Sequence, residues 1–138
     1  MTIGGPRGSF IIPLDCDWHL FIGDETALPA VARRLEELPA CARAMLLLQA
    51  ADIADQRVFK TAANVSLQWV RSDHELLAAV RALALPRGDG YAWCAGEAAV
   101  MASVRRVLVE EKDHDRHAIR AAAYWQRGAV GHHQNLEE

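Results

Sequence analysis

Residues 18–35, "WHLFIGDETALPAVARRL", are the stretch that decides the fold. The stretch begins with a short apolar strand at 18–22, and Gly23 ends that strand. Apolar residues then recur at helical spacing, with arginines and glutamates turned outward, which predicts a helix with one buried stripe. Pro29 fits only the first turn of such a helix, where a missing N–H costs little. A strand that leads directly into an amphipathic helix is typical of α/β folds.

The rest of the chain repeats this alternation of strands and helices. Four further strands are predicted, in "ARAMLLLQAAD", "NVSLQWV", "YAWCAGE" and "AAAYW". One helix is predicted to begin at the "SDHE" segment, with Leu83 among its inward residues, and another over 98–111, with a short helical turn in "HDRHAIR". This order of elements builds right-handed parallel crossovers. We therefore expect an α/β fold, a three-layer doubly wound parallel sheet of about five strands.

The second helix has signals at both of its ends. "SDHE" is a capping box, in which Ser72 accepts from a first-turn N–H and Glu75 reaches back to the Ser72 N–H. The helix is expected to stop at "PRGDG", where Pro86, Gly88 and Gly90 would build a turn. The capping box follows a strand directly, so the helix begins at the carboxyl edge of the predicted sheet.

Composition limits the classes of function. A chain of 138 residues buries roughly two thirds of its unfolded surface, which is enough for a single core. The net charge of -3 gives no electrostatic case for nucleic acid, and no apolar run approaches the roughly 20 residues of a membrane helix. The first residues lack the pattern of a signal peptide, so we expect a cytoplasmic protein. Cys16, Cys41 and Cys94 are odd in number and far apart, which favours reduced thiols.

Three segments are predicted along the chain. Residues 1–13 are rich in glycine and proline and are interpreted as an interdomain seam or linker. Residues 14–128 are expected to form the folded domain, and residues 129–138 a flexible tail.

The loops after the first, third and fourth predicted strands are the candidate site. They are "GDET", "RSDHE" and "AGEA", and each begins a helix. In doubly wound sheets ligands bind outside the carboxyl ends of the strands, where the strand order reverses. Free N–H groups at helix N-termini attract the anionic groups of a nucleotide. Arg71 would add a fixed positive charge suited to a ribose phosphate.

Each loop also has a local explanation. In "GDET", Asp24 or Thr26 would cap the helix, and acidic side chains there would repel a pyrophosphate. A phosphate at that turn would then have to use backbone N–H groups and Thr26. Arg71 is equally well explained as a solvated arginine beside a capping box, and Gly96 as a residue that lets the helix pack closely on its strand.

Other chemistry-bearing residues give weaker signals. His114 and His117 lie near carboxylates but not at a recognised ligand spacing, so surface positions are expected. Cys94 lies within an apolar strand and is expected to be a buried small hydrophobe. Trp69, Trp93 and Trp125 are expected in the core, although Trp125, near the carboxyl end of the last predicted strand, could instead face a flat ring. No nucleophile with a nearby base is found, so no catalytic residue and no metal site are predicted.

Four motifs together resemble the C-terminal half of the siderophore-interacting proteins, the flavin-dependent ferric-siderophore reductases of bacteria. They are "GPRGSF", "GDETALPA", "YAWCAGEA" and "AAAYWQRG", and they span nearly the whole chain. The resemblance implies a ferredoxin-reductase-like NAD(P)H-binding module, normally preceded by a barrel that holds FAD. In that family the nicotinamide passes a hydride to the flavin, which reduces siderophore-bound Fe(III) and releases Fe(II).

The resemblance also implies roles for individual residues. One group would line the nicotinamide and the pyrophosphate: Gly23, Asp24, Glu25 and Thr26, with Gly96, Glu97 and Ala98 on the nicotinamide side. Arg71 and Ser72 would contact the adenosine ribose and a 2'-phosphate, which slightly favours NADPH over NADH. Trp125 would lie near the flavin interface, and Arg7 would belong to the basic surface that attracts an anionic ferric siderophore.

One motif of the family is absent from this sequence. The Arg-x-Tyr-Thr/Ser flavin motif of the upstream barrel is not found, so FAD is expected to be held by a missing or separate domain. The alternative prediction is a non-catalytic remnant that acts as a partner-binding or dimerising module, such as a homodimer. Apolar surface near Phe10, Ile11, Ile12 and Trp125 would favour such association.

Overall fold

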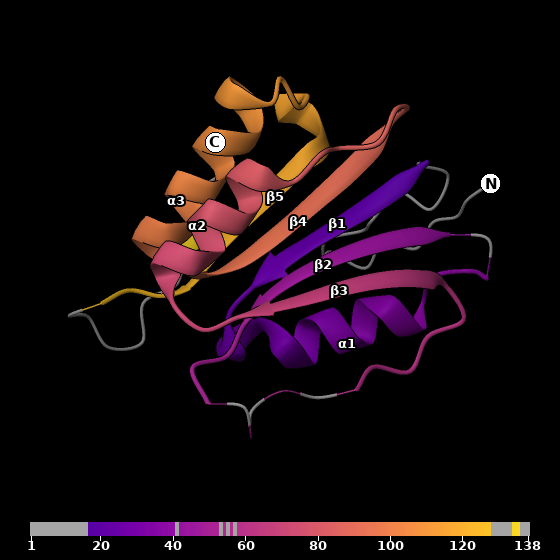
Figure 1. Cartoon of the computed structure of the whole chain (residues 1–138), viewed down its shortest axis with the longest axis horizontal. Helices are drawn as coiled ribbons and strands as arrows, with labels where there is room; N and C mark the ends of the chain where they lie inside the picture. The colour runs from indigo at the N-terminus through magenta and orange to yellow at the C-terminus, as the bar shows by residue number, and fades with distance from the viewer. Residues whose placement is uncertain are drawn as a thin grey trace.

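A parallel sheet forms the middle of the molecule. The computed structural model describes residues 17–40, 42–52, 54, 56, 58–127 and 134–135 (Figure 1). The strands are β1 (Trp18–Gly23), β2 (Arg43–Gln49), β3 (Asn64–Val70), β4 (Gly90–Glu97), β5 (Ile119–Trp125) and β6 (Gln134–Asn135). They are ordered β3-β2-β1-β4-β5-β6. β1 to β5 are parallel, and the unpredicted β6 pairs antiparallel with β5.

Helices cover both faces of this sheet (Figure 1). α1 (Leu28–Glu36) follows a short 3-10 helix, η1 (Glu25–Ala27), and covers one face. α2 (Asp73–Ala82) and α3 (Ala98–Arg106) cover the other face, and α3 continues into a π-helical segment, η3 (Val107–Glu111). A last 3-10 turn, η4 (Arg116–Ala118), leads into β5. The three-layer α/β fold predicted from the sequence is confirmed.

The core has two parts because side chains alternate along each strand. On β1, Leu20 and Ile22 pack toward α2 and α3, whereas Phe21 packs toward α1. β2 has five consecutive buried residues, as expected for a strand covered on both faces. Trp93 is buried on the α1 side, and Cys94 is buried on the other side. Burial raises the pKa of the Cys94 thiol to about 12, so the predicted inert small hydrophobe is confirmed.

Several predicted boundaries are corrected by the structure. α2 ends at Ala82, because Leu83 is extended and serves as the C-cap. Regular α-helix in α3 ends at Arg106, where the π-helical turn begins. Glu75 accepts a hydrogen bond from the Arg71 N–H at 2.9 Å rather than from Ser72. Gly90 belongs to β4 and not to the preceding turn.

Some predictions lie outside the described residues. These are the seam at 1–13, the roles of Arg7 and of the apolar residues at 10–12, and nearly all of the predicted tail at 129–138. Cys16 and Cys41 also lie outside the described part. None of the described helices combines the length and the apolar character that crossing a bilayer requires.

Gly90 tests the packing at the start of β4. A Cβ on Gly90 would lie 1.9 Å from the nearest atom of the buried Trp18 indole, so a side chain there must displace the ring. We expect Gly90→Ala to lower the free energy of unfolding by about 2 kcal/mol, measured by urea denaturation. Ala78→Ser on the exposed face of α2 is the control. A loss below about 0.5 kcal/mol, as for a surface substitution, would contradict this packing.

Candidate functional site

The carboxylate of Asp24 connects the carboxyl ends of two strands. Asp24 follows β1 and is only 5% exposed. Its Oδ1 accepts hydrogen bonds from the N–H of Thr26 at 3.0 Å and from the Thr26 hydroxyl at 2.5 Å. Its Oδ2 accepts the indole N–H of Trp125 at 2.8 Å. This last bond joins residues 101 positions apart and ties β5 to β1 across β4.

Gly96 leaves the space that the Asp24 carboxylate occupies. A Cβ on Gly96 would lie 2.8 Å from Asp24 Oδ2 and 3.0 Å from Asp24 Cγ. The sequence suggested that Gly96 lets the following helix pack closely on its strand. In the structure, the nearest neighbour of a Cβ at this position is the Asp24 carboxylate. Gly23 is constrained differently, because a Cβ there would meet Ala27 Cβ at 2.9 Å and the carbonyl oxygen of Ala95 at 3.0 Å.

Glu97 is a second buried carboxylate at the same edge of the sheet. Its Oε1 caps α3 by accepting the Val100 N–H at 3.0 Å, and its Oε2 accepts the Arg127 N–H at 3.0 Å. Burial works to raise the pKa of Glu97, but the hydrogen bonds from Arg127 and Val100 and the positive charge of Arg127 together lower it. Glu97 is therefore ionised at neutral pH.

An ion pair crosses from the end of β5 to the start of α2. The guanidinium of Arg127 donates to Asp73 Oδ2 at 2.8 Å and lies 5.3 Å from the centre of the Trp125 ring. Asp73 Oδ1 also accepts the Gln49 side-chain N–H at 2.9 Å. Asp73 thus joins the end of β2, the first turn of α2 and the segment after β5. The sequence analysis did not select Arg127, Asp73 or Gln49 as site residues. Asp73 lies in "RSDHE", Arg127 in "AAAYWQRG" and Gln49 in the predicted strand "ARAMLLLQAAD".

Side chains of the chain itself cap the helices at all three predicted loops. Asp24 caps η1, Ser72 accepts the Glu75 N–H at 3.1 Å, and Glu97 caps α3. Both donors of Thr26 point to Asp24. A contact between a phosphate and Thr26 therefore stays a prediction. It requires the Thr26 N–H or hydroxyl to leave Asp24 and donate to the phosphate instead.

The predicted site residues form two groups in the structure. Asp24, Gly96, Glu97 and Trp125 lie together where the strand order reverses between β1 and β4. Arg71 and Ser72 lie at the carboxyl end of β3, on the far side of β2, and Arg71 is exposed. Glu25 lies between the groups and accepts the Ala51 N–H at 2.8 Å. Ala98 is buried as the first residue of α3.

The described residues contain no cluster of three or more histidine, cysteine or acidic side chains that would hold a metal ion. His114 instead forms a 2.8 Å hydrogen bond with the carbonyl of Ala118, and its ring packs against Trp18 at 5.6 Å between centroids.

The pH dependence of stability tests the buried state of Glu97. Because the pKa of Glu97 is lower in the folded chain than its ordinary value of 4.5, its contribution is present above that pH. That contribution is lost as the pH falls through the folded-state pKa. We expect the free energy of unfolding of Glu97→Gln to fall less steeply below pH 4.5 than that of the wild type. Glu110→Gln, at an exposed position, is the control, and equal slopes for wild type and Glu97→Gln would contradict the assignment.

Comparisons with known proteins agree with this fold. The family model described as siderophore-interacting protein matches residues 16–128. The NADPH-dependent ferric-chelate reductase of Escherichia coli K12 is 32% identical over 129 residues, which is 91% of this chain and 50% of that protein. The ferric vibriobactin reductase ViuB of Vibrio cholerae is 30% identical over 131 residues, covering 90% of this chain and 48% of ViuB.

Solved structures give the same result. A siderophore utilization protein from T. fusca superimposes with a TM-score of 0.81 at 32% identity, covering 93% of this chain and 51% of that one. The siderophore-interacting protein SipS from Aeromonas hydrophila gives 0.71 at 30% identity, over 80% and 51% of the two chains. The chain thus spans about half the length of these relatives, consistent with the C-terminal half expected from its motifs. It belongs to the siderophore-interacting protein family.

Proposed function

We propose that this chain is the NAD(P)H-binding half of a ferric-siderophore reductase. The observation that carries the proposal is the convergence of Asp24, Glu97 and Trp125 at the point where the strand order reverses. Relatives named as a NADPH-dependent ferric-chelate reductase and a ferric vibriobactin reductase support it. The rest of the proposed enzyme is an FAD-binding domain, preceding this one or on a separate chain, that acts on a ferric siderophore in the cytoplasm.

The residues at this edge fit a dinucleotide whose nicotinamide end lies beside Glu97 and Trp125. The half-buried Trp125 indole is held by Asp24 Oδ2, so it offers a flat apolar surface in a fixed orientation. The Arg127 side chain is 63% exposed in its pair with Asp73, so a phosphate can compete with that carboxylate. Arg71 offers a second exposed guanidinium toward the adenosine end.

NADPH, when bound, supplies a hydride that the flavin accepts before the iron is reduced. The contribution of this chain is position and charge. Glu97 is held by N–H groups from two segments and stays ionised, so it favours positive charge at the ring end of the site. The tie from Trp125 to Asp24 keeps the end of β5 against β1 and fixes the surface that would face the flavin. The proposed roles of Gly23, Glu25 and Arg7 remain predictions.

Arg71 tests the preference for NADPH. A guanidinium that contacts a 2'-phosphate makes a charge-assisted hydrogen bond that NADH cannot form. We expect Arg71→Ala to weaken NADPH binding about tenfold and NADH binding much less, measured by calorimetry. The exposed Arg106→Ala at the end of α3 is the matched control and should leave both affinities unchanged. Equal weakening of NADPH and NADH by Arg71→Ala would remove the basis for preferring NADPH.

Calorimetric titration of the chain with NADPH, NADH and FAD tests the proposed function itself. The same titrations are then repeated with a flavin-binding half from a relative added. We expect NADPH to bind the chain alone, and FAD to bind only when the flavin-binding half is present. If no dinucleotide gives heat or a thermal shift under either condition, the non-catalytic partner-binding module becomes the better description.

A further inference from the structure

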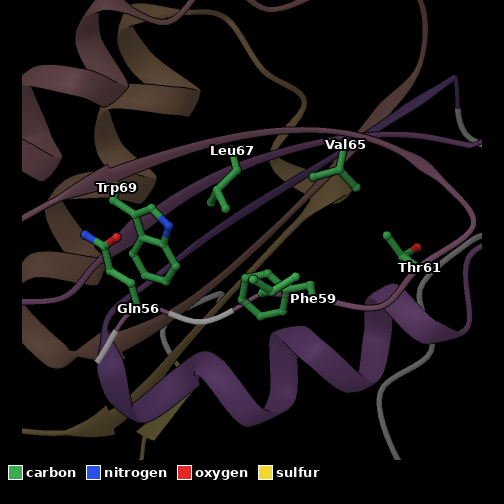
Figure 2. Close-up of a pocket in the computed structure, with 7 residues that line it drawn as sticks. Gln56, Phe59, Thr61, Val65, Leu67 and Trp69 are labelled. Carbon is green, nitrogen blue, oxygen red and sulfur yellow. The ribbon is translucent and has the colours of Figure 1, made fainter. Parts of the chain in front are cut away.

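We infer that a groove beside β3 holds the adenine ring of the dinucleotide, an inference that rests on the proposed function. The groove has a volume of about 460 Å³, within the range of ligand-binding pockets. Figure 2 shows its lining side chains between β3 and α1. They are Gln56, Val58, Phe59, Thr61, Val65, Leu67 and Trp69.

The groove lies along β3, the edge strand of the sheet, on the face that α1 covers. Val65, Leu67 and Trp69 alternate onto the α1 face, in register with residues of β2. The connection from β2 to β3 contains no α-helix among its described residues, and its Phe59 and Ala63 are only partly buried against the core on this face. Val65 and Leu67 therefore stay 38% and 40% exposed. Exposed apolar side chains that line one groove are typical of a binding surface.

The lining favours a flat, uncharged ring. None of the described residues that line the groove carries a charge. The rings of Phe59 and Trp69 are nearly parallel, with an interplanar angle of 16° and 6.4 Å between their centres. Nucleobases stack on such aromatic surfaces. The Gln56 carboxamide lies beside the Trp69 indole in Figure 2, and it can donate and accept hydrogen bonds as the edge of adenine requires.

The position of the groove fits the adenosine end of the proposed site. Trp69 lies near the carboxyl end of β3, two residues before Arg71 and three before Ser72. A base stacked at the Trp69 end of the groove would place its ribose toward Arg71. Three strand spacings, roughly 14 Å, separate β3 from β4, where Glu97 lies, and the Trp125 indole reaches back from β5 to Asp24 at the end of β1. A dinucleotide that spans this distance would bring its other ring to Glu97 and Trp125.

The indole N–H signals of Trp69 and Trp125 in the ¹⁵N-labelled full chain report on the two ends of the site separately. Each signal is assigned with a Trp→Phe variant. Adenosine 2',5'-bisphosphate should shift the Trp69 signal and leave Trp125 in place, and NADPH should shift both. Phe59→Leu should weaken binding of the bisphosphate about tenfold. Leu67→Glu, which adds a charge at a half-exposed lining position, should weaken it as well.

Controls separate binding from folding. Tyr91→Leu removes an aromatic ring near the amino end of β4 and should not change the affinity for the bisphosphate. Thermal unfolding without nucleotide checks that each variant is folded. NADPH could shift the Trp125 signal without moving the Trp69 signal, while Phe59→Leu binds the bisphosphate as tightly as the wild type. The adenine site would then be wrong, and the proposed function would stand. If neither nucleotide binds, both fail.

A second copy of the chain is the competing occupant. Dimerisation that shifts Trp69 without nucleotide, and that Leu67→Glu abolishes, would assign the groove to an interface between copies. That result, with no nucleotide effect on Trp69, would overturn the inference.

Discussion

The buried carboxylate of Asp24 is the constraint on which the carboxyl edge of the sheet depends. A carboxylate taken from water is costly unless its oxygens are hydrogen-bonded. Asp24 meets this condition with two donors from Thr26 and one from Trp125. The arrangement requires Gly96 on the strand between them, since any Cβ there would collide with the carboxylate. The turn after β1 therefore holds the end of β5 in place through the Asp24–Trp125 hydrogen bond. This role explains why the turn carries a buried aspartate.

This anchor divides the proposed site into a carboxylate end and an arginine end. Asp24 and Glu97 are buried beside Trp125, where an uncharged or positively charged ring is favoured and a phosphate is not. Arg71 is exposed at the end of β3. The exposed Arg127 lies between the two ends, because its guanidinium pairs with Asp73 at the start of α2 and lies 5.3 Å from the centre of the Trp125 ring. In the proposed function, this charge distribution would orient the dinucleotide with its nicotinamide toward β4 and its adenosine toward β3. The aromatic groove continues the site in the same direction.

Local patterns predicted the fold well because strands and helices follow the spacing of apolar residues. The predicted strand "NVSLQWV" is β3 to the residue, and Pro29 lies at the start of α1 as expected. The π-helical turn after α3 and the short strand β6 were missed, because neither has a distinct periodicity.

The candidate site was predicted less completely. Asp24, Glu97 and Trp125 were selected, but the sequence does not show that Trp125 donates to Asp24 from 101 positions away. The pair of Arg127 with Asp73 was missed for the same reason. The partner of Glu75 was predicted as the Ser72 N–H, but it is the Arg71 N–H. The sequence "SDHE" is the same in both arrangements, so it does not show which N–H group Glu75 bonds. The family was recognised from motifs, which local physics alone would not have identified.

The most direct test of the account is a crystal structure of this chain, joined to its flavin-binding half, with NADPH bound. We expect density for the dinucleotide across the carboxyl ends of β4, β1, β2 and β3, with the nicotinamide beside Glu97. The Asp24–Trp125 hydrogen bond should be intact in that complex. Nucleotide bound at the amino edge of the sheet, or with its nicotinamide at β3, would contradict the account.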